Sequence, residues 1–238
     1  MRPAFYALRP GGWRDYVTLL HPPYTAWHLS YVVVGGCLAP VVAWGRLGLT
    51  VLAFALAMGI GAHALDELHG RPLQTAIPRR VLVALAVGSV AAACAIGIAV
   101  ATRTTLWVLA FVTVGAVLVP AYNLELLGGR LHSDVWFALS WGAFPVLTAY
   151  VAMTGRIRAD AVLAAAWATV LSLTQRRLSS PVRRLRRDVR DVTGELELVD
   201  GTREPLTRAS LTAAPEAALR LLTVSTILVA ATLVALRL

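Results

Sequence analysis

The feature that most constrains this chain is a series of apolar runs, each nearly free of charge and about 20 residues long. A helix of that length crosses the roughly 30 Å hydrocarbon core of a bilayer and satisfies its own backbone polar groups. Apolar residues make up 58% of the 238 residues. The pattern predicts an all-α polytopic transmembrane helical bundle, a single domain over residues 1–238. About seven spans are expected: Trp27–Trp44, Leu47–Leu68, Val81–Ala101, Thr105–Leu127, Val135–Thr154, Ala159–Leu173 and Leu219–Leu236.

Two longer segments lie outside these spans. Residues 1–25 contain polar side chains and a Pro22-Pro23 break, so we expect no cleavable signal peptide and a short helix lying against the membrane surface. Residues 175–214 are predicted to form an Arg-rich cytoplasmic loop. The sixth span is short, so its flanking Asp160 and Arg177 are expected to reach the interface by snorkelling.

The basic residues predict the orientation of the bundle. All 22 are arginine, and 17 of them, Arg2 included, fall on the side of the N-terminus in this topology. The positive-inside rule then places the N-terminus, the loop after Leu68 and residues 175–214 in the cytoplasm, in a bacterial-type inner (plasma) membrane. The net charge of +9 is a sign of topology, and nucleic acid is not expected as a partner. The other side carries Arg46, Arg103, Arg156, Arg158 and Arg237.

Four ionisable side chains crowd the end of the second span, in the sequence HALDELH. A charge at bilayer depth costs about 2.5 to 3.5 kcal/mol on insertion scales, so such groups commonly face a cavity, a pore or a metal. On a helix, His63 shares a face with Asp66 and Glu67, and Asp66 shares one with His69. These four residues are candidate metal ligands. Their carboxylates suit Mg²⁺, whereas paired imidazoles favour Zn²⁺ or Fe²⁺; a plain polar helix end at the membrane surface is the alternative.

The arginines that follow the sixth span allow two interpretations. They can lie on anionic lipid headgroups. Alternatively, Arg176 and Arg177 bind a phosphate-bearing substrate, because guanidinium groups pair with phosphate in a bidentate way. Proximity to Asp66 would favour the second interpretation.

The stretch GIGAHALDELHGRPLQTAIPRRVL resembles the region after the second transmembrane helix in the UbiA superfamily of intramembrane prenyltransferases. There, an NDxxDxxxD motif precedes an RPL-type turn, and Asp66 takes the place of its second Asp. Residues 24–40 and 122–150 are similar to the family's opening helix and to its fourth and fifth helices. Where the family carries a second Asp-rich motif, this chain has Gln175-Arg176-Arg177.

The resemblance implies a Mg²⁺-dependent transferase that acts on an isoprenoid diphosphate within the membrane lipid. Asp66 and Glu67 are then the expected catalytic and metal-binding carboxylates, and guanidinium groups replace the missing acids around the diphosphate. Pro120 is expected to kink the fourth span and turn polar groups toward a cavity. The predicted substrate-binding residues are Arg71, Tyr122, Asn123, Arg176 and Arg177.

Three alternatives remain open at this stage. One is a membrane terpene cyclase of the same fold. A second is a membrane metalloenzyme that holds Zn²⁺ or Fe²⁺ through His63, Asp66, Glu67 and His69. The third is a non-catalytic relative that binds a lipid.

Overall fold

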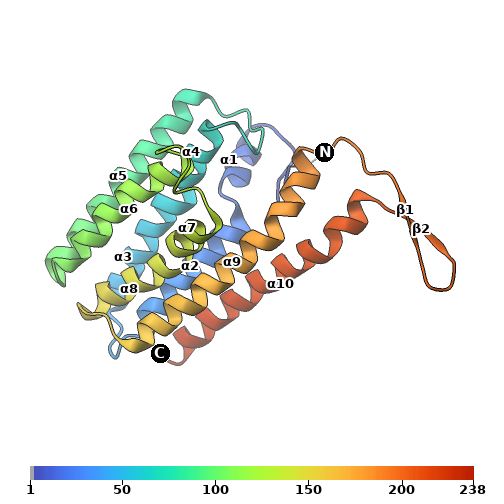
Figure 1. Cartoon of the computed structure of the whole chain (residues 1–238). Helices are drawn as coiled ribbons and strands as arrows, with labels where there is room; N and C mark the ends of the chain where they lie inside the picture. Colours follow the sequence, from blue (N-terminus) through green and yellow to red (C-terminus); the bar gives the residue numbers. More distant parts are fainter. Residues whose placement is uncertain (1–2) are drawn as a thin grey trace.

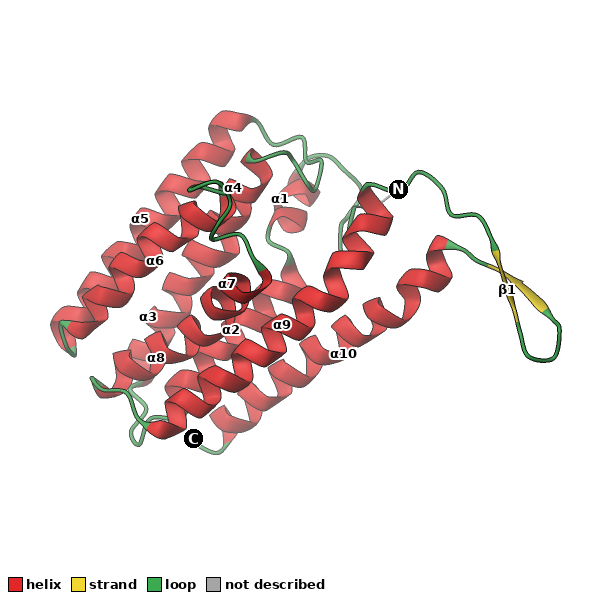
Figure 2. Cartoon of the chain, in the orientation of Figure 1, coloured by secondary structure: helices red, strands yellow, loops and turns green. Residues whose placement is uncertain are grey.

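The computed structural model describes residues 3–238, so Arg2, counted above with the cytoplasmic arginines, lies outside the described residues. Helices run side by side in a bundle, with α5 next to α6 and α9 next to α10 (Figure 1). A single small hairpin stands away from the bundle (Figure 2). The helices are α1 (Trp13–Leu19), α2 (Pro22–Cys37), α3 (Trp44–Phe54), η1 (Ala55–Ala62), α4 (His63–Leu68), α5 (Arg79–Arg103), α6 (Trp107–Asn123), α7 (Asp134–Ala138), η2 (Leu139–Ala143), α8 (Phe144–Thr154), α9 (Ala159–Arg187) and α10 (Arg208–Ala235), and the strands are β1 (Glu195–Glu197) and β2 (Arg203–Pro205).

Within residues 3–238, four helical runs are long and apolar enough to cross a membrane: Trp44–Leu68, Arg79–Arg103, Asp134–Thr154 and Arg208–Ala235. The predicted class, a helical bundle with membrane-length apolar helices, is therefore confirmed. The number of seven spans is not shown. Each predicted span does fall on a helix, but α2 has 16 residues and α6 has 17, which is short for a crossing. Helix α9 has the length, with 29 residues, but arginines fill its C-terminal part.

The segment 175–214 differs from its prediction as a loop. Helix α9 continues to Arg187, and α10 already begins at Arg208, where Thr207 and Ser210 form a capping box. Arginine has a high helix propensity, so a run of charge does not end a helix by itself. An ion pair between Arg186 Nε and Glu216 Oε1, at 2.6 Å, joins the two helices in this region. Only residues 188–207 connect them, and they carry the hairpin.

Glycines let the central helices approach closely. A Cβ added to Gly35 on α2 would overlap the backbone carbonyl of Val146 on α8, and one on Gly142 would lie 2.5 Å from the carbonyl oxygen of Ala168 on α9. Helix α2 is also tied to η2, because His28 Nδ1 bonds the carbonyl oxygen of Trp141 at 2.8 Å. These contacts bring α2, η2 and α9 together around one cavity.

Two helices widen into π-helical turns, η1 and η2, within otherwise α-helical runs. Such turns insert a residue into the helical register and recur at functional sites. Here η1 contributes Met58 and Ala62, and η2 contributes Trp141, to the same cavity. The two irregular segments therefore face the region in which the polar residues gather.

Candidate functional site

A polar cavity of about 340 Å³ is lined by residues of α4 and of the C-terminal half of α9. Both helices finish at the same end of the bundle (Figure 1). The cavity walls come from the N-terminal segment, α2, η1, α4, the end of α6, α7, η2 and α9, and from the loops that follow α4 and α6. Segments far apart in the sequence thus meet here. The polar lining residues are Tyr6, His21, Tyr24, His28, His63, Asp66, His69, Tyr122, Asn123, Glu125, His132, Gln175, Arg176, Ser179, Arg183 and Arg187.

All five histidines of the chain line this cavity. Only His63 and His69 were predicted as site residues, since the other three lie far from the HALDELHG segment in sequence. Three of the rings form a hydrogen bond between Nδ1 and a backbone carbonyl oxygen. The pairs are His28 with Trp141 at 2.8 Å, His63 with Gly59 at 3.0 Å and His132 with Tyr122 at 3.1 Å. These bonds orient the rings in the wall.

The structure brings six of the predicted site residues into the cavity and leaves three outside it. The six come from α4 and the residue after it, from the end of α6 and from α9. Those in the cavity are His63, Asp66, His69, Tyr122, Asn123 and Arg176, and those outside it are Glu67, Arg71 and Arg177.

Glu67 and Arg71 organise the loop after α4. The Glu67 carboxylate is fully buried and accepts hydrogen bonds from the backbone N–H groups of Leu73 (3.0 Å) and Thr75 (2.8 Å) and from the Thr75 hydroxyl (2.9 Å). Arg71 donates to the carbonyl oxygens of Thr75 and Ile77. Adjacent helical residues point about 100° apart. Asp66 can therefore face the cavity only if Glu67 turns away, which the expectation of two carboxylates on one ion overlooked.

Arg176 and Arg177 separate in the same way. Arg176 lines the cavity, with its Nε 3.0 Å from Asp134 Oδ1 and an Nη2 that donates to His132 Nε2 at 3.4 Å. The side chain of Arg177 is 78% exposed and also lies near Asp134. Of the two predicted phosphate ligands, only Arg176 can reach a molecule in the cavity.

Arg183 and Arg187 also line the cavity, and sequence reasoning missed both. Neither forms an ion pair within residues 3–238. Arg183 donates to Ser180 Oγ at 3.3 Å, and Arg187 donates to the carbonyl oxygen of Pro3 at 3.5 Å. A guanidinium group has five N–H donors, so both keep donors for an anion. The sequence does contain a pattern that could have indicated them: Arg183 follows Arg176 by seven residues, and Arg187 follows Arg183 by four. On a helix that continues to Arg187, these spacings place all three side chains on one face.

Asp66 is the acidic group that faces these arginines across the cavity from α4. It is half-buried, and within the described part of the chain it takes part in no hydrogen bond or ion pair that would hold it in the wall. Its carboxylate is therefore available to a ligand, unlike that of Glu67. Glu125, after α6, supplies the second carboxylate of the lining.

His21 sits in a constrained position between α1 and α2. It has a left-handed backbone (φ 46°), which is costly for a residue other than glycine, and its ring stacks on that of His63 at 4.0 Å. Burial, followed by the nearby His63, holds the pKa of His21 well below 6.5, and burial raises the pKa of Tyr6. The protonated Tyr6 hydroxyl donates to His21 Nδ1 at 2.9 Å. The Nε2 atom is buried and has no partner among the described residues.

Two more buried polar atoms of the lining are unpartnered within residues 3–238: the Tyr122 hydroxyl and Gln175 Oε1. Tyr122 stacks on His132 with ring centroids 4.5 Å apart, and Asn123 Nδ2 donates to the carbonyl oxygen of Val119 at 2.7 Å. Buried polar atoms are rarely left without a partner, because each costs about 1 to 3 kcal/mol. A ligand or ordered water in the cavity would satisfy them.

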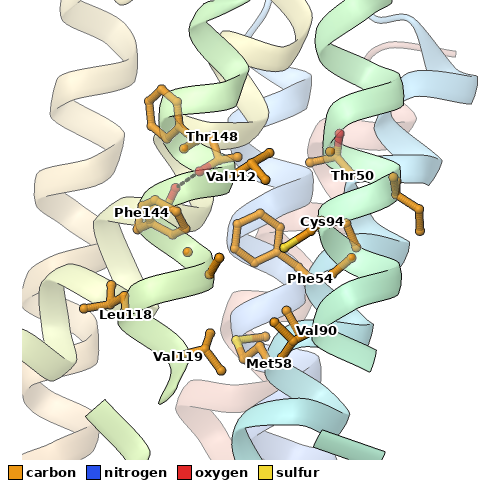
Figure 3. Close-up of a pocket in the computed structure, with 18 of the residues that line it drawn as sticks. Thr50, Phe54, Met58, Val90, Cys94, Val112, Leu118, Val119, Phe144 and Thr148 are labelled. Atoms are coloured by element: carbon orange, nitrogen blue, oxygen red, sulfur yellow. Dashed lines mark hydrogen bonds between the residues drawn. The ribbon is translucent and has the colours of Figure 1, made fainter. Parts of the chain in front are cut away.

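An apolar pocket of about 90 Å³ adjoins the polar cavity, and Met58 and Trp141 line both. Figure 3 shows its walls, which include Phe54, Val112 and Phe144. The threonines in the wall are turned inward to their own helices, since Thr50 and Thr148 donate to backbone carbonyl oxygens at 2.9 Å and 2.7 Å. The pair of spaces therefore matches a molecule with an anionic head and a hydrocarbon tail.

The residues in the cavity fit one mode of metal binding and not another. Across residues 3–238, no three His, Cys, Asp or Glu side chains are grouped closely enough to hold an ion. A Zn²⁺ or Fe²⁺ site with three protein ligands does not fit this arrangement. Mg²⁺ is commonly bound through one or two carboxylates, with water and substrate phosphate as further ligands. Asp66 suits that role.

The fold and the site thus define a helical protein with membrane-length apolar helices and an arginine- and histidine-lined cavity next to an apolar pocket. No protein-family model, curated protein or solved structure matches the chain.

Proposed function

We propose that this protein is a UbiA-like membrane prenyltransferase that acts on an isoprenoid diphosphate with Mg²⁺. One observation carries the proposal: two arginines lie close to an apolar pocket. Arg183 and Arg187 line the polar cavity and have no ion-pair partner in the described chain, and the apolar pocket begins at Met58 and Trp141 in the same cavity wall. Half-buried cations that no carboxylate contacts directly are costly, so an anion is expected beside them. A prenyl diphosphate supplies both the anion and the tail.

The arginines would stabilise the leaving group. When the bond between the allylic carbon and the diphosphate oxygen breaks, negative charge accumulates on the diphosphate. Fixed guanidinium donors stabilise that charge more than they stabilise the starting ester. Asp66 would hold the Mg²⁺ ion, which would neutralise the diphosphate further when bound. The cavity would face the cytoplasm of a bacterial-type inner membrane, as the distribution of arginines predicts.

A non-catalytic lipid-binding relative is the second candidate. It is favoured by the position of Glu67, which leaves one carboxylate of the DELHG segment in the cavity. Both candidates predict binding of the isoprenoid diphosphate, but only an enzyme releases diphosphate from it.

The test uses the full chain in nanodiscs with radiolabelled prenyl diphosphates, with and without Mg²⁺ and a mixture of small aromatic acceptors. We expect Mg²⁺-dependent release of diphosphate that Asp66→Asn abolishes. Asp191→Asn, in the exposed segment after α9, is the matched control and should keep wild-type turnover. Binding without any release would favour the lipid-binding relative, and absence of both binding and release would refute the proposal.

A further inference from the structure

Hydrogen bonds at Nδ1 determine which ring nitrogen carries the hydrogen in the cavity histidines. In His28, His63 and His132, Nδ1 faces a backbone carbonyl oxygen, which can only accept, so Nδ1 itself carries the hydrogen. The neutral ring then has a lone pair at Nε2. His132 shows this directly, because its Nε2 accepts from Arg176 Nη2 at 3.4 Å. These three rings therefore have an acceptor, and not a donor, at Nε2.

His21 has the opposite arrangement. Its Nδ1 lies 2.9 Å from the Tyr6 hydroxyl, and the hydroxyl donates because an imidazole nitrogen is a better acceptor than a phenol oxygen. The hydrogen of the neutral ring is then on Nε2, and a protonated ring would carry one there as well. His21 Nε2 is therefore an N–H donor in either state. It is buried and has no partner among residues 3–238.

The His21 ring is held in a fixed position in the cavity wall. Tyr6 bonds one edge of the ring, and His63 stacks on its face with ring centroids 4.0 Å apart and an angle of 10° between the planes. The backbone of His21 is left-handed, with φ 46°. Such a conformation is unfavourable for a residue with a Cβ and persists where the surrounding structure holds it. The donor is thus already oriented before a ligand binds.

Two guanidinium groups lie near this donor. Burial and His63 lower the pKa of His21 most, and Arg187 and Arg183 lower it further, so both cations are close to the ring. Both also line the cavity. A buried N–H group needs an acceptor, and the acceptor that also suits two cations is an anionic oxygen. A phosphate oxygen has both properties.

We propose that His21 Nε2 donates a hydrogen bond to a phosphate oxygen of the isoprenoid diphosphate, next to Arg183 and Arg187, and that Tyr6 keeps the hydrogen on Nε2. This inference rests on the function proposed above and adds a neutral donor to the arginines that bind the head group. His21 is a binding residue. Tyr6 acts through His21 and is a positioning residue.

Substitutions of His21 can separate the N–H donor from the aromatic ring. His21→Phe keeps a ring that can stack on His63 and removes both nitrogens. His21→Gln keeps an N–H donor, since the side-chain amide can reach the position of Nε2. Tyr6→Phe removes the hydroxyl alone. Tyr16→Phe, at an exposed position on α1 outside the cavity, is its matched control.

The first experiment measures the Kd of inorganic diphosphate and of farnesyl diphosphate for each variant in nanodiscs. Farnesol is the probe without phosphate, and thermal unfolding checks the fold. His21→Phe should raise the Kd of both diphosphates by about tenfold or more, the loss expected for one hydrogen bond to a charged group. His21→Gln should recover most of this loss, Tyr6→Phe should cause a smaller rise, and Tyr16→Phe should stay within about twofold of wild type. The Kd of farnesol should not change.

The second experiment locates the hydrogen on the ring by nitrogen-15 NMR of the histidine-labelled full chain without ligand. The His21 signal is assigned by its absence in His21→Gln. It should show the hydrogen on Nε2, and Tyr6→Phe should increase the fraction with the hydrogen on Nδ1. A hydrogen on Nδ1 alone in wild type would overturn the inference, even if His21→Phe fails to fold.

The binding data distinguish failure of this inference from failure of the proposed function. An unchanged Kd of both diphosphates in folded His21→Phe, or a rise that farnesol shares, would overturn the inference and leave the proposed function intact. Failure of both diphosphates to bind wild type would refute the proposed function, and this inference with it.

Discussion

Replacing Arg183 with glutamine tests whether the cavity binds an anion. Arg183 lines the cavity, is half-buried and forms no ion pair within the described residues, so its removal takes away a cation without breaking an internal salt bridge. A hydrogen bond to a charged group contributes about 1.5 to 3 kcal/mol. The Kd for an isoprenoid diphosphate should therefore rise by about 10-fold to 150-fold.

The neighbouring Arg184 provides the control, because Arg184→Gln makes the same change of charge on the same helix at an exposed position outside the cavity. Calorimetric titration in nanodiscs at low and at moderate salt would measure both variants. The control should stay within about twofold of wild type, since a screened surface charge contributes little. Equal losses in Arg183→Gln and Arg184→Gln would show that net surface charge, and not the cavity, attracts the ligand. Wild-type affinity in Arg183→Gln would refute the anion site itself.

Three further predictions concern stability. Since His21 has a pKa below 6.5 in the fold, its contribution is complete above about pH 6.5 and is lost as the pH falls toward the lowered pKa; the Tm in detergent should drop over that range, less so in His21→Gln, and a flat profile would contradict this. Glu67→Gln should lower the free energy of unfolding by about 1 to 3 kcal/mol, because an amide NH₂ would face a backbone donor, whereas Asp66→Asn should unfold like wild type; equal stability of Glu67→Gln and wild type would count against the loop contacts. Gly142→Val should prevent assembly, since its Cβ would lie 2.5 Å from a backbone oxygen; a folded, monodisperse variant in gel filtration would be the contrary result.

The fold class, a helical bundle with membrane-length apolar helices, could be inferred from the sequence, because the length and apolar character of a segment are properties of that segment alone. An apolar run within a bilayer satisfies its backbone polar groups as a helix, and each of the seven predicted spans overlaps a helix, although α2 ends at Cys37 and not at the predicted Trp44. The residues at which the helices end were harder to predict. Charge was taken to end the sixth span at Leu173, yet α9 continues to Arg187 because its neighbours, among them Glu216 on α10, pack along it.

The candidate site was only partly predictable, for a reason of geometry. The HALDELHG segment indicates that ionisable groups cluster at one helix end, and Asp66 and His63 do line the cavity. Which way each side chain turns depends on the phase of the helix, and Glu67 is directed to the amide groups of Leu73 and Thr75 instead. No local pattern indicates that a loop will supply those donors.

The amino-acid sequence by itself determined that this chain forms apolar helices of membrane length, because this property belongs to individual segments and does not depend on their neighbours. Only the tertiary structure decided that five histidines from three parts of the chain share one cavity, that Arg183 and Arg187 join Arg176 there, and that an apolar pocket lies next to them. The physical reason is that a cavity is the space that packed helices fail to fill. Its position depends on close approaches such as that of Gly142 to Ala168, which act between segments and appear only when the bundle is assembled.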